Sequence, residues 1–302
     1  MLDLLNYYYY IITDRVSLKN NNYYFTYQNN YFCFYKYNGS LNEINELFNL
    51  NTYMLYNNYQ INRIILNNKK EILTLYDNNY YCLVLLKINS LDYVNINQVI
   101  AFNQRNINLN ILLRNNWYYL WSNKIDNIEY SINHLMHKYK LLYNSIYYYI
   151  GLTENSISYL KLLSVDNRNL SISHKRVNSN TSLVEFYNPL NLVIDYRIRD
   201  LAEYLKSCFF NLKMDILEII NYFKKIKMSE SDYLYFYVRM LFPSYYFDIY
   251  DNILSGKMDE KSILKITKLQ DDYEYLLYEI YLVIKSRINI IGIDWINSKF
   301  SI

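Results

Sequence analysis

The chain has 302 residues, 52% of them hydrophobic, which is enough for one long domain or two lobes that share an interface. Its net charge of +3, from 31 Lys and Arg against 28 Asp and Glu, argues against a dedicated nucleic-acid-binding protein. The three cysteines, Cys33, Cys82 and Cys208, form no CxxC pair and predict a reduced, cytoplasmic protein. We expect no signal peptide and no membrane span, because the start lacks a basic region and no apolar run is long enough.

The first part of the chain has a β-like pattern. Residues 23–27 and 31–37 are rich in aromatic side chains, and the Gln-Asn-Asn turn at 28–30 between them predicts a β-hairpin. Ser40 and Glu43 have the spacing of a capping box, and apolar residues at helical spacing follow them. The sequence therefore predicts a hairpin followed by one helix.

Three more strands are expected after this helix, at residues 60–66, 71–76 and 80–86, with Asn-rich turns between them. We therefore predict that residues 1–88 form a small antiparallel β-rich lobe that carries one helix. No internal repeat or flexible linker separates this part from the rest of the chain.

Residues 89–302 are predicted to form a larger lobe that is helical from Trp117 onward, with a helix break near Gly151. The segment 171–194 differs, because it is polar and ends in a short apolar run, which predicts a loop that leads into a strand. Helices are expected again from Leu201 to the C-terminus. The fold class is α+β with two lobes.

Three short stretches carry a family resemblance. They are I-S-H-K-R-V at 172–177, N-L-V-I-D-Y-R at 191–197 and D-L-A-E-Y at 200–204. Together they resemble the aminoglycoside and choline phosphotransferase branch of the protein-kinase-like fold. There an H-G-D-x-x-x-x-N loop precedes an apolar strand ending in I-D, and D-L-A opens the next helix. Residues 117–250 are most similar to the spore coat protein S group of kinase-like proteins from spore-forming bacteria.

The resemblance assigns four positions of the catalytic loop, and two of them are altered. His174 matches the loop histidine and Asp195 the aspartate that binds Mg²⁺, whereas Arg176 replaces the catalytic aspartate and Thr181 the loop asparagine. An arginine cannot act as a base, because its guanidinium stays protonated. A cation at this position would also repel Mg²⁺.

The nucleotide-binding side also departs from the family. No glycine precedes Gly39, so the glycine-rich loop that approaches the phosphates is missing. Lys36 could match the strand lysine of the family, with Glu46 or Glu43 as its helix partner. The simpler alternatives are that Lys36 is a solvated charge and that Glu43 only belongs to the capping box.

Asp200 has a structural interpretation. It precedes a helix expected at Leu201, so the sequence predicts that it is the N-cap of that helix. In related folds, the resemblance implies, the same aspartate also braces the catalytic loop.

The leading hypothesis is a catalytically degenerate kinase-like protein that binds other proteins and needs no cofactor. If the resemblance extends to function, its partners are components of the spore coat. The alternative is an ATP- and Mg²⁺-dependent phosphotransferase for a small hydroxylated or amino substrate, with Asp166 or Glu185 as an unorthodox base.

Overall fold

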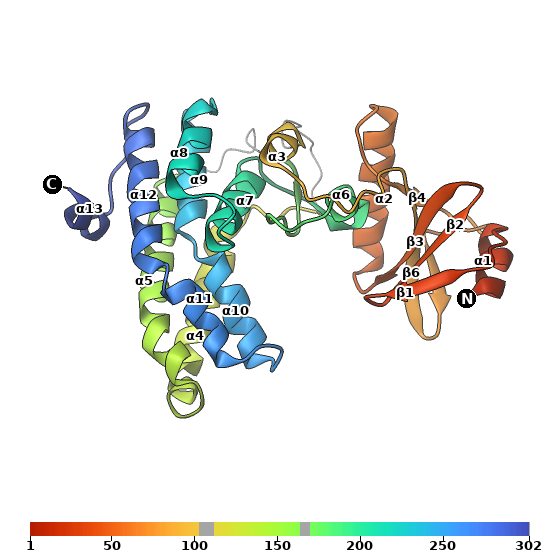
Figure 1. Ribbon diagram of the computed structural model, residues 1–302, viewed down its shortest axis with the longest axis horizontal. Coiled ribbons are helices and arrows are strands. Elements are labelled where there is room, and N and C mark those ends of the chain that lie inside the picture. Colours follow the sequence, from red (N-terminus) through yellow and green to blue (C-terminus); the bar gives the residue numbers. More distant parts are fainter. Residues whose placement is uncertain (103–111, 164–169, 302) are drawn as a thin grey trace. The chain divides into compact units, whose positions relative to one another are not determined.

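The computed structural model describes residues 1–102, 112–163 and 170–301 (Figure 1). These residues form two compact units. The first consists of residues 1–94, 112–113 and 180–194, and the second of residues 95–102, 114–163, 170–179 and 195–301. The first unit therefore takes in a segment from the middle of the chain in addition to its N-terminal part.

The first unit contains an antiparallel sheet in which β1, β2, β3, β6 and β4 are neighbours in that order, while β5 also pairs with β6. The strands are β1 (Val16–Lys19), β2 (Asn22–Tyr27), β3 (Asn30–Tyr37), β4 (Arg63–Ile65), β5 (Leu73–Tyr76) and β6 (Asn79–Leu86). The predicted hairpin is confirmed as β2 and β3. Gln28 and Asn29 in its turn have φ angles of 48° and 60°, the left-handed conformation of the turns that suit the twist of a hairpin.

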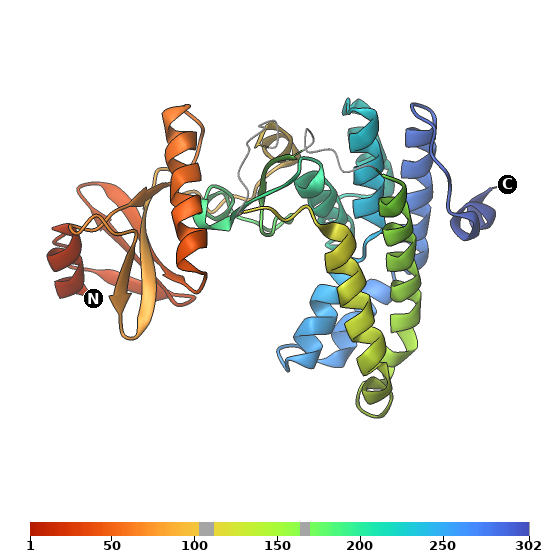
Figure 2. The same cartoon turned by 180° about the vertical axis from the view of Figure 1, so that it is seen from behind.

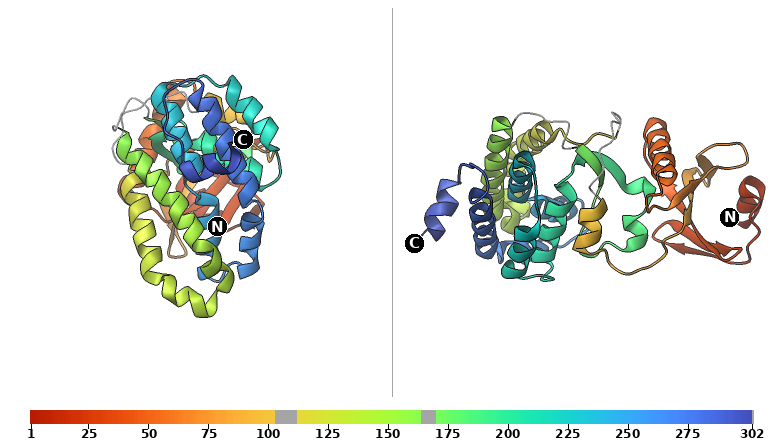
Figure 3. Two further views of the ribbon diagram at one scale, coloured as in Figure 1. Left: turned by 90° about the vertical axis from the view of Figure 1, so that its left-hand side faces the viewer. Right: turned by 90° about the horizontal axis from the view of Figure 1, so that it is seen from above.

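Two helices lie on opposite sides of this sheet, α1 (Leu2–Tyr9) and α2 (Leu41–Tyr56) (Figures 1 and 3). The sequence did not predict α1 or β1. Leu5 of α1 is fully buried in a cluster with Phe25, Phe34 and other sheet residues, so α1 depends on the sheet it covers. The predicted capping contact of α2 is present, because Ser40 Oγ accepts a hydrogen bond from Glu43 N at 3.1 Å.

The second unit consists mainly of helices, and Figure 2 shows α4 and α5 running side by side. Its helices are α3 (Ile96–Phe102), α4 (Trp117–Lys138), α5 (Lys140–Leu162), α7 (Arg199–Phe210), α8 (Ile216–Lys225), α9 (Glu230–Leu241), α10 (Ser244–Leu254), α11 (Leu264–Thr267), α12 (Gln270–Lys285) and α13 (Asp294–Phe300), with the 3₁₀ turn η3 (Glu260–Ile263) before α11. The predicted break at Gly151 is wrong, since α5 runs through it. A single glycine costs a helix only about 1 kcal/mol, and burial of Ile146 and Ile150 offsets that cost.

The segment 171–194 contains more regular structure than the predicted loop. It includes most of β7 (Leu170–His174), the short helix α6 (Leu183–Phe186) and the 3₁₀ turn η2 (Pro189–Asn191), and it leads into β8 (Leu192–Tyr196). β7 and β8 form a two-stranded sheet. All five residues of β7 are buried although several are polar, and this is why the pattern of hydrophobic residues did not reveal the strand.

No helix among the described residues has the length and apolar character that crossing a membrane requires.

Replacing Ser40 with alanine should lower the free energy of unfolding by about 1 kcal/mol, because Glu43 N at the start of α2 loses its side-chain acceptor. Urea denaturation measures this change. Ser40→Asp, which keeps an acceptor at the cap, should unfold like the wild type. Equal losses in the two variants would contradict a capping role for Ser40.

Candidate functional site

The loop that follows β7 is fixed by the first turn of α7. Both carboxylate oxygens of Asp200 accept from His174 N, at 3.2 and 3.1 Å, and Oδ2 also lies 2.7 Å from the ring Nδ1 of His174. Both side chains are about 1% exposed. The predicted N-cap role of Asp200 is wrong, because the N-cap is Ile198 and Asp200 lies inside the helix with its carboxylate directed to the loop.

Arg199 connects this loop to Asp195. Its Nε lies 3.1 Å from Asp195 Oδ2, its Nη2 donates to Lys175 O at 2.9 Å, and its Nη1 donates to His174 O. One guanidinium therefore joins the end of β8 to two successive carbonyls of the loop.

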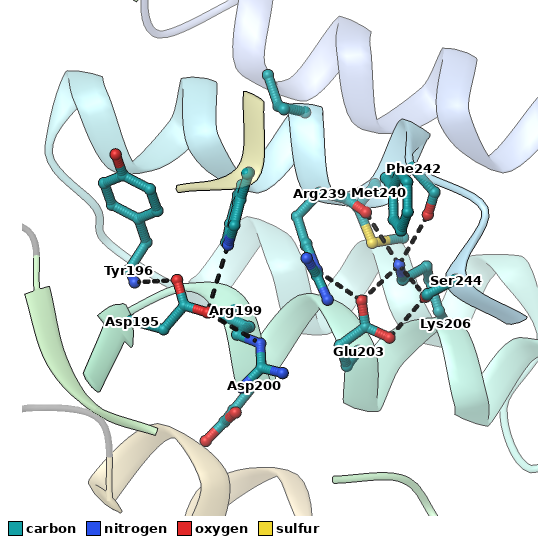
Figure 4. Close-up of polar contacts among 12 residues, drawn as sticks. Asp195, Tyr196, Arg199, Asp200, Glu203, Lys206, Arg239, Met240, Phe242 and Ser244 are labelled. Atoms are coloured by element: carbon teal, nitrogen blue, oxygen red, sulfur yellow. Dashed lines mark hydrogen bonds and ion pairs between the residues drawn. The ribbon is translucent and has the colours of Figure 1, made fainter. Parts of the chain in front are cut away.

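Asp195 is almost completely buried, and its oxygens already have several partners (Figure 4). Oδ1 accepts from Tyr196 N at 2.8 Å, and Oδ2 accepts from Trp117 Nε1 at 3.3 Å in addition to its ion pair with Arg199. Burial raises the pKa of Asp195 to about 6, even though Arg199, Arg239 and these hydrogen bonds act in the opposite direction.

Arg176 forms an ion pair at the surface. Its Nη1 lies 2.6 Å from Asp248 Oδ2 of α10, and the two side chains are 75% and 45% exposed. The hydrogen bond to Asp248 raises the pKa of Arg176 further above its usual value. Arg176, which the sequence predicts at the position of the catalytic base, therefore stays a cation.

A buried charge network on α7 and α9 was not predicted (Figure 4). Glu203 Oε1 lies 2.6 Å from Lys206 Nζ and 2.7 Å from Arg239 Nε, and Ser244 Oγ donates to Oε2 at 2.7 Å. Lys206 Nζ also donates to the carbonyls of Arg239 and Phe242, each at 3.0 Å. Glu203 and Lys206 are three residues apart, a spacing that in sequence looks like an ordinary surface pair.

Burial and the neighbouring charges compete in setting the pKa values of Glu203 and Lys206. Burial alone would raise the pKa of Glu203, but the charges of Lys206 and Arg239 outweigh it and lower this pKa to about 2. Burial lowers the pKa of Lys206 to about 8 despite the attraction of Glu203. Both groups are charged at neutral pH.

These groups surround a pocket of about 340 Å³ that lies within the second unit. His174, Arg176 and Asp200 line it. The other charged lining residues are Lys124, Lys175, Arg199, Glu203, Lys206, Arg239, Asp248 and Asp251. Phe242, Tyr245 and Phe247 add aromatic walls. The arrangement can bind a small charged group, and Arg176 contributes an exposed cation to it.

Three other predicted residues belong to the first unit. Lys36 and Glu46 are both half-buried on β3 and α2, and within the described chain no ion pair joins them. Thr181 contributes its carbonyl to a hydrogen bond from Val94 N at 2.9 Å. The nucleotide-binding role of Lys36 and Glu46 stays a prediction, as does the replacement of the loop asparagine by Thr181.

Asp166 and Glu185 were predicted as an unorthodox base, and the structure describes the second of them. Glu185 is half-buried in the first unit and accepts from Asn191 Nδ2 at 3.0 Å. Asp166 lies outside the described residues. The described part of the chain contains no cluster of three or more His, Cys, Asp or Glu side chains that could hold a metal ion.

The fold is that of kinase-like phosphotransferases. An aminoglycoside phosphotransferase from Alicyclobacillus acidocaldarius subsp. acidocaldarius DSM 446 superimposes with a TM-score of 0.65 over 94% of this chain and 96% of the other, at 10% identity. Spectinomycin phosphotransferase APH(9)-Ia gives 0.58 over 93% and 97%, at 11% identity. The amicoumacin kinase hAmiN gives 0.56 over 95% and 92%, also at 11% identity.

Within this class the sequence identifies a particular family. Residues 3–280 match the family described as spore coat putative kinase YutH, and the chain belongs to that family. The endospore coat-associated protein YutH of Bacillus subtilis (strain 168) is 30% identical over 165 residues, which cover 48% of each chain. The match thus spans about half the length of this curated relative. The predicted fold and the predicted spore coat resemblance are both confirmed.

Replacing Asp200 with alanine should cost about 2 kcal/mol or more, because the buried His174 N and the His174 ring lose their acceptor. Chemical denaturation measures the loss. Asp215→Ala is the matched control, since Asp215 is a true N-cap that is exposed and accepts from Glu218 N, and its loss should be about 1 kcal/mol. An Asp200 variant no worse than the Asp215 variant would contradict the bracing role.

The network of Glu203 should make stability depend on acid pH. Its folded pKa of about 2 lies below the usual 4.5, so its carboxylate stabilises the folded state above about pH 4.5 and this contribution fades as the pH falls toward 2. The difference in unfolding free energy between wild type and Glu203→Gln should therefore shrink when the pH is lowered from about 6 to about 3. Glu154→Gln, at an exposed position on α5, is the control. A difference that is constant over this range would contradict the assignment.

Proposed function

We propose that this chain is a catalytically degenerate kinase-like protein that acts by binding other proteins during assembly of the spore coat. The observation that carries the proposal is the guanidinium of Arg176 at the position of the catalytic base, paired with Asp248. Phosphoryl transfer in this fold needs a carboxylate there to orient the acceptor hydroxyl and receive its proton. A protonated arginine does neither.

The metal side of the site supports the same proposal. Mg²⁺ requires hard oxygen ligands, and Asp195 is the one family ligand retained in the sequence. Its Oδ2 is already shared by the Arg199 guanidinium and the Trp117 indole, and its burial favours the protonated form. Threonine at position 181 replaces the second ligand. The residues present therefore do not fit a Mg²⁺ site unless Arg199 moves away.

The phosphate side supports it too. The turns that connect β1 to β2 and β2 to β3 are formed by Asn20, Asn21, Gln28 and Asn29, all with positive φ angles. None of these four positions is a glycine, whereas a glycine-rich loop leaves the backbone open to a close approach of phosphates. A protein that only binds other proteins needs the fold but does not need phosphates to approach its backbone.

The partners under this proposal are spore coat proteins, and the location is the cytoplasm of the developing cell followed by the coat. The name of the Bacillus subtilis relative, an endospore coat-associated protein, supports this assignment. A kinase-like fold without turnover can keep a partner surface while it loses the chemistry, because fold and activity are separable.

The purified chain should transfer or hydrolyse no phosphate at a rate typical of kinases, which is on the order of 1–100 per second. The assay uses γ-labelled ATP with Mg²⁺ and with Mn²⁺, and Asp195→Ala is the control. The melting temperature with Mg·ATP should also be no higher than with ATP in EDTA, because a metal-dependent complex with the folded state would raise it further. Turnover that disappears in Asp195→Ala would instead indicate an active phosphotransferase.

A further inference from the structure

The pocket of the second unit has a surplus of positive charge. Six basic side chains line it against four acidic ones, with His174 counted as neutral. Asp195 stands behind Arg199 and neutralises it, which leaves a surplus of one positive charge. The buried cations Lys206 and Arg239 both pair with the half-buried Glu203. The exposed charges that a ligand can reach are therefore those at the mouth of the pocket.

Arg176 is the most accessible of the cations at the mouth. Its side chain is 75% exposed, and Nη1 donates to Asp248. Its Nε and Nη2 groups donate to no residue in the described part of the chain. A guanidinium with free donors on one edge can bind a carboxylate or phosphate through two parallel hydrogen bonds.

Two carboxylates of α10 already form ion pairs with cations at the mouth of the pocket, so the cations there bind oxyanions. Asp248 pairs with Arg176, and Asp251 pairs with Lys124 at 2.9 Å. Asp248 and Asp251 are 45% and 58% exposed, so water screens both pairs and each contributes little to stability. A competing oxyanion can therefore replace or join these carboxylates at low cost.

We propose that this pocket binds an oxyanion, either a phosphate group or a carboxylate, with Arg176 as its main ligand and Lys124 as a second cation. The inference rests on the proposed function, because it requires that Arg176 is a binding residue at a position that has lost its base. The anion can come from free phosphate or from an acidic side chain of a partner protein, and the two sources share the same chemistry.

Isothermal titration calorimetry of the full chain, in low salt with EDTA, tests the proposal. The probes are inorganic phosphate and a hexaglutamate peptide. Arg176→Gln should weaken binding of the bound probe about tenfold or more, because a charge-assisted pair is lost. Asp248→Asn should tighten it about threefold to tenfold, because the competing carboxylate is removed and the fold is otherwise kept.

Arg197→Gln is the matched control, since Arg197 also pairs with an aspartate, Asp232, but does not line the pocket. It should bind like the wild type. Opposite shifts in Arg176→Gln and Asp248→Asn support the proposal, with phosphate or the peptide identified as the source by whichever binds. No heat with either probe, or weaker binding in both variants, would overturn it. Phosphate transfer in the γ-labelled assay would overturn the proposed function, whereas the titrations measure anion binding by Arg176 directly, so the two failures are distinguishable.

Discussion

The contact between Asp200 and His174 fixes the loop after β7, which lines the pocket of the second unit. A carboxylate in the first turn of α7 accepts from the backbone and lies against the ring at the end of β7, and both groups are excluded from water. Because a buried donor without an acceptor is costly, this contact favours a single conformation of the loop after β7. That conformation sets the position of Arg176, and the neighbouring Arg199 then ties Asp195 to the same loop.

Charge compensation explains why the acids and bases of this site can be held rigidly inside the protein. Asp195 and Asp200 are buried and Glu203 is half-buried, and each lies against a cation or a set of hydrogen-bond donors, so every one of these acids is satisfied within the protein. An active phosphotransferase leaves such acids available for metal and substrate. Here the internal partners hold the scaffold, and the accessible charge lies at the mouth, on Arg176 and Lys124 with their exposed aspartates.

The sequence was sufficient for elements with a strong local signal. The hairpin of β2 and β3 and the capped start of α2 follow from turn and cap chemistry within a few residues. The sequence did not predict α1, whose stability comes from the packing of Leu5 against the sheet. It wrongly predicted a helix break at Gly151, where packing outweighs helix propensity. Those outcomes depend on contacts that no local pattern contains.

The sequence by itself determined the α+β class and the kinase-like family, and it predicted that the catalytic aspartate is replaced by Arg176, because residue identity can be read without tertiary structure. Only the tertiary structure decided which residues Arg176 and the buried charged groups contact. Asp248 lies 72 positions after Arg176, and Arg239 lies 36 positions after Glu203. Pairs so far apart in sequence meet only when helices pack, so their charges, pKa values and the pocket they form are properties of the fold.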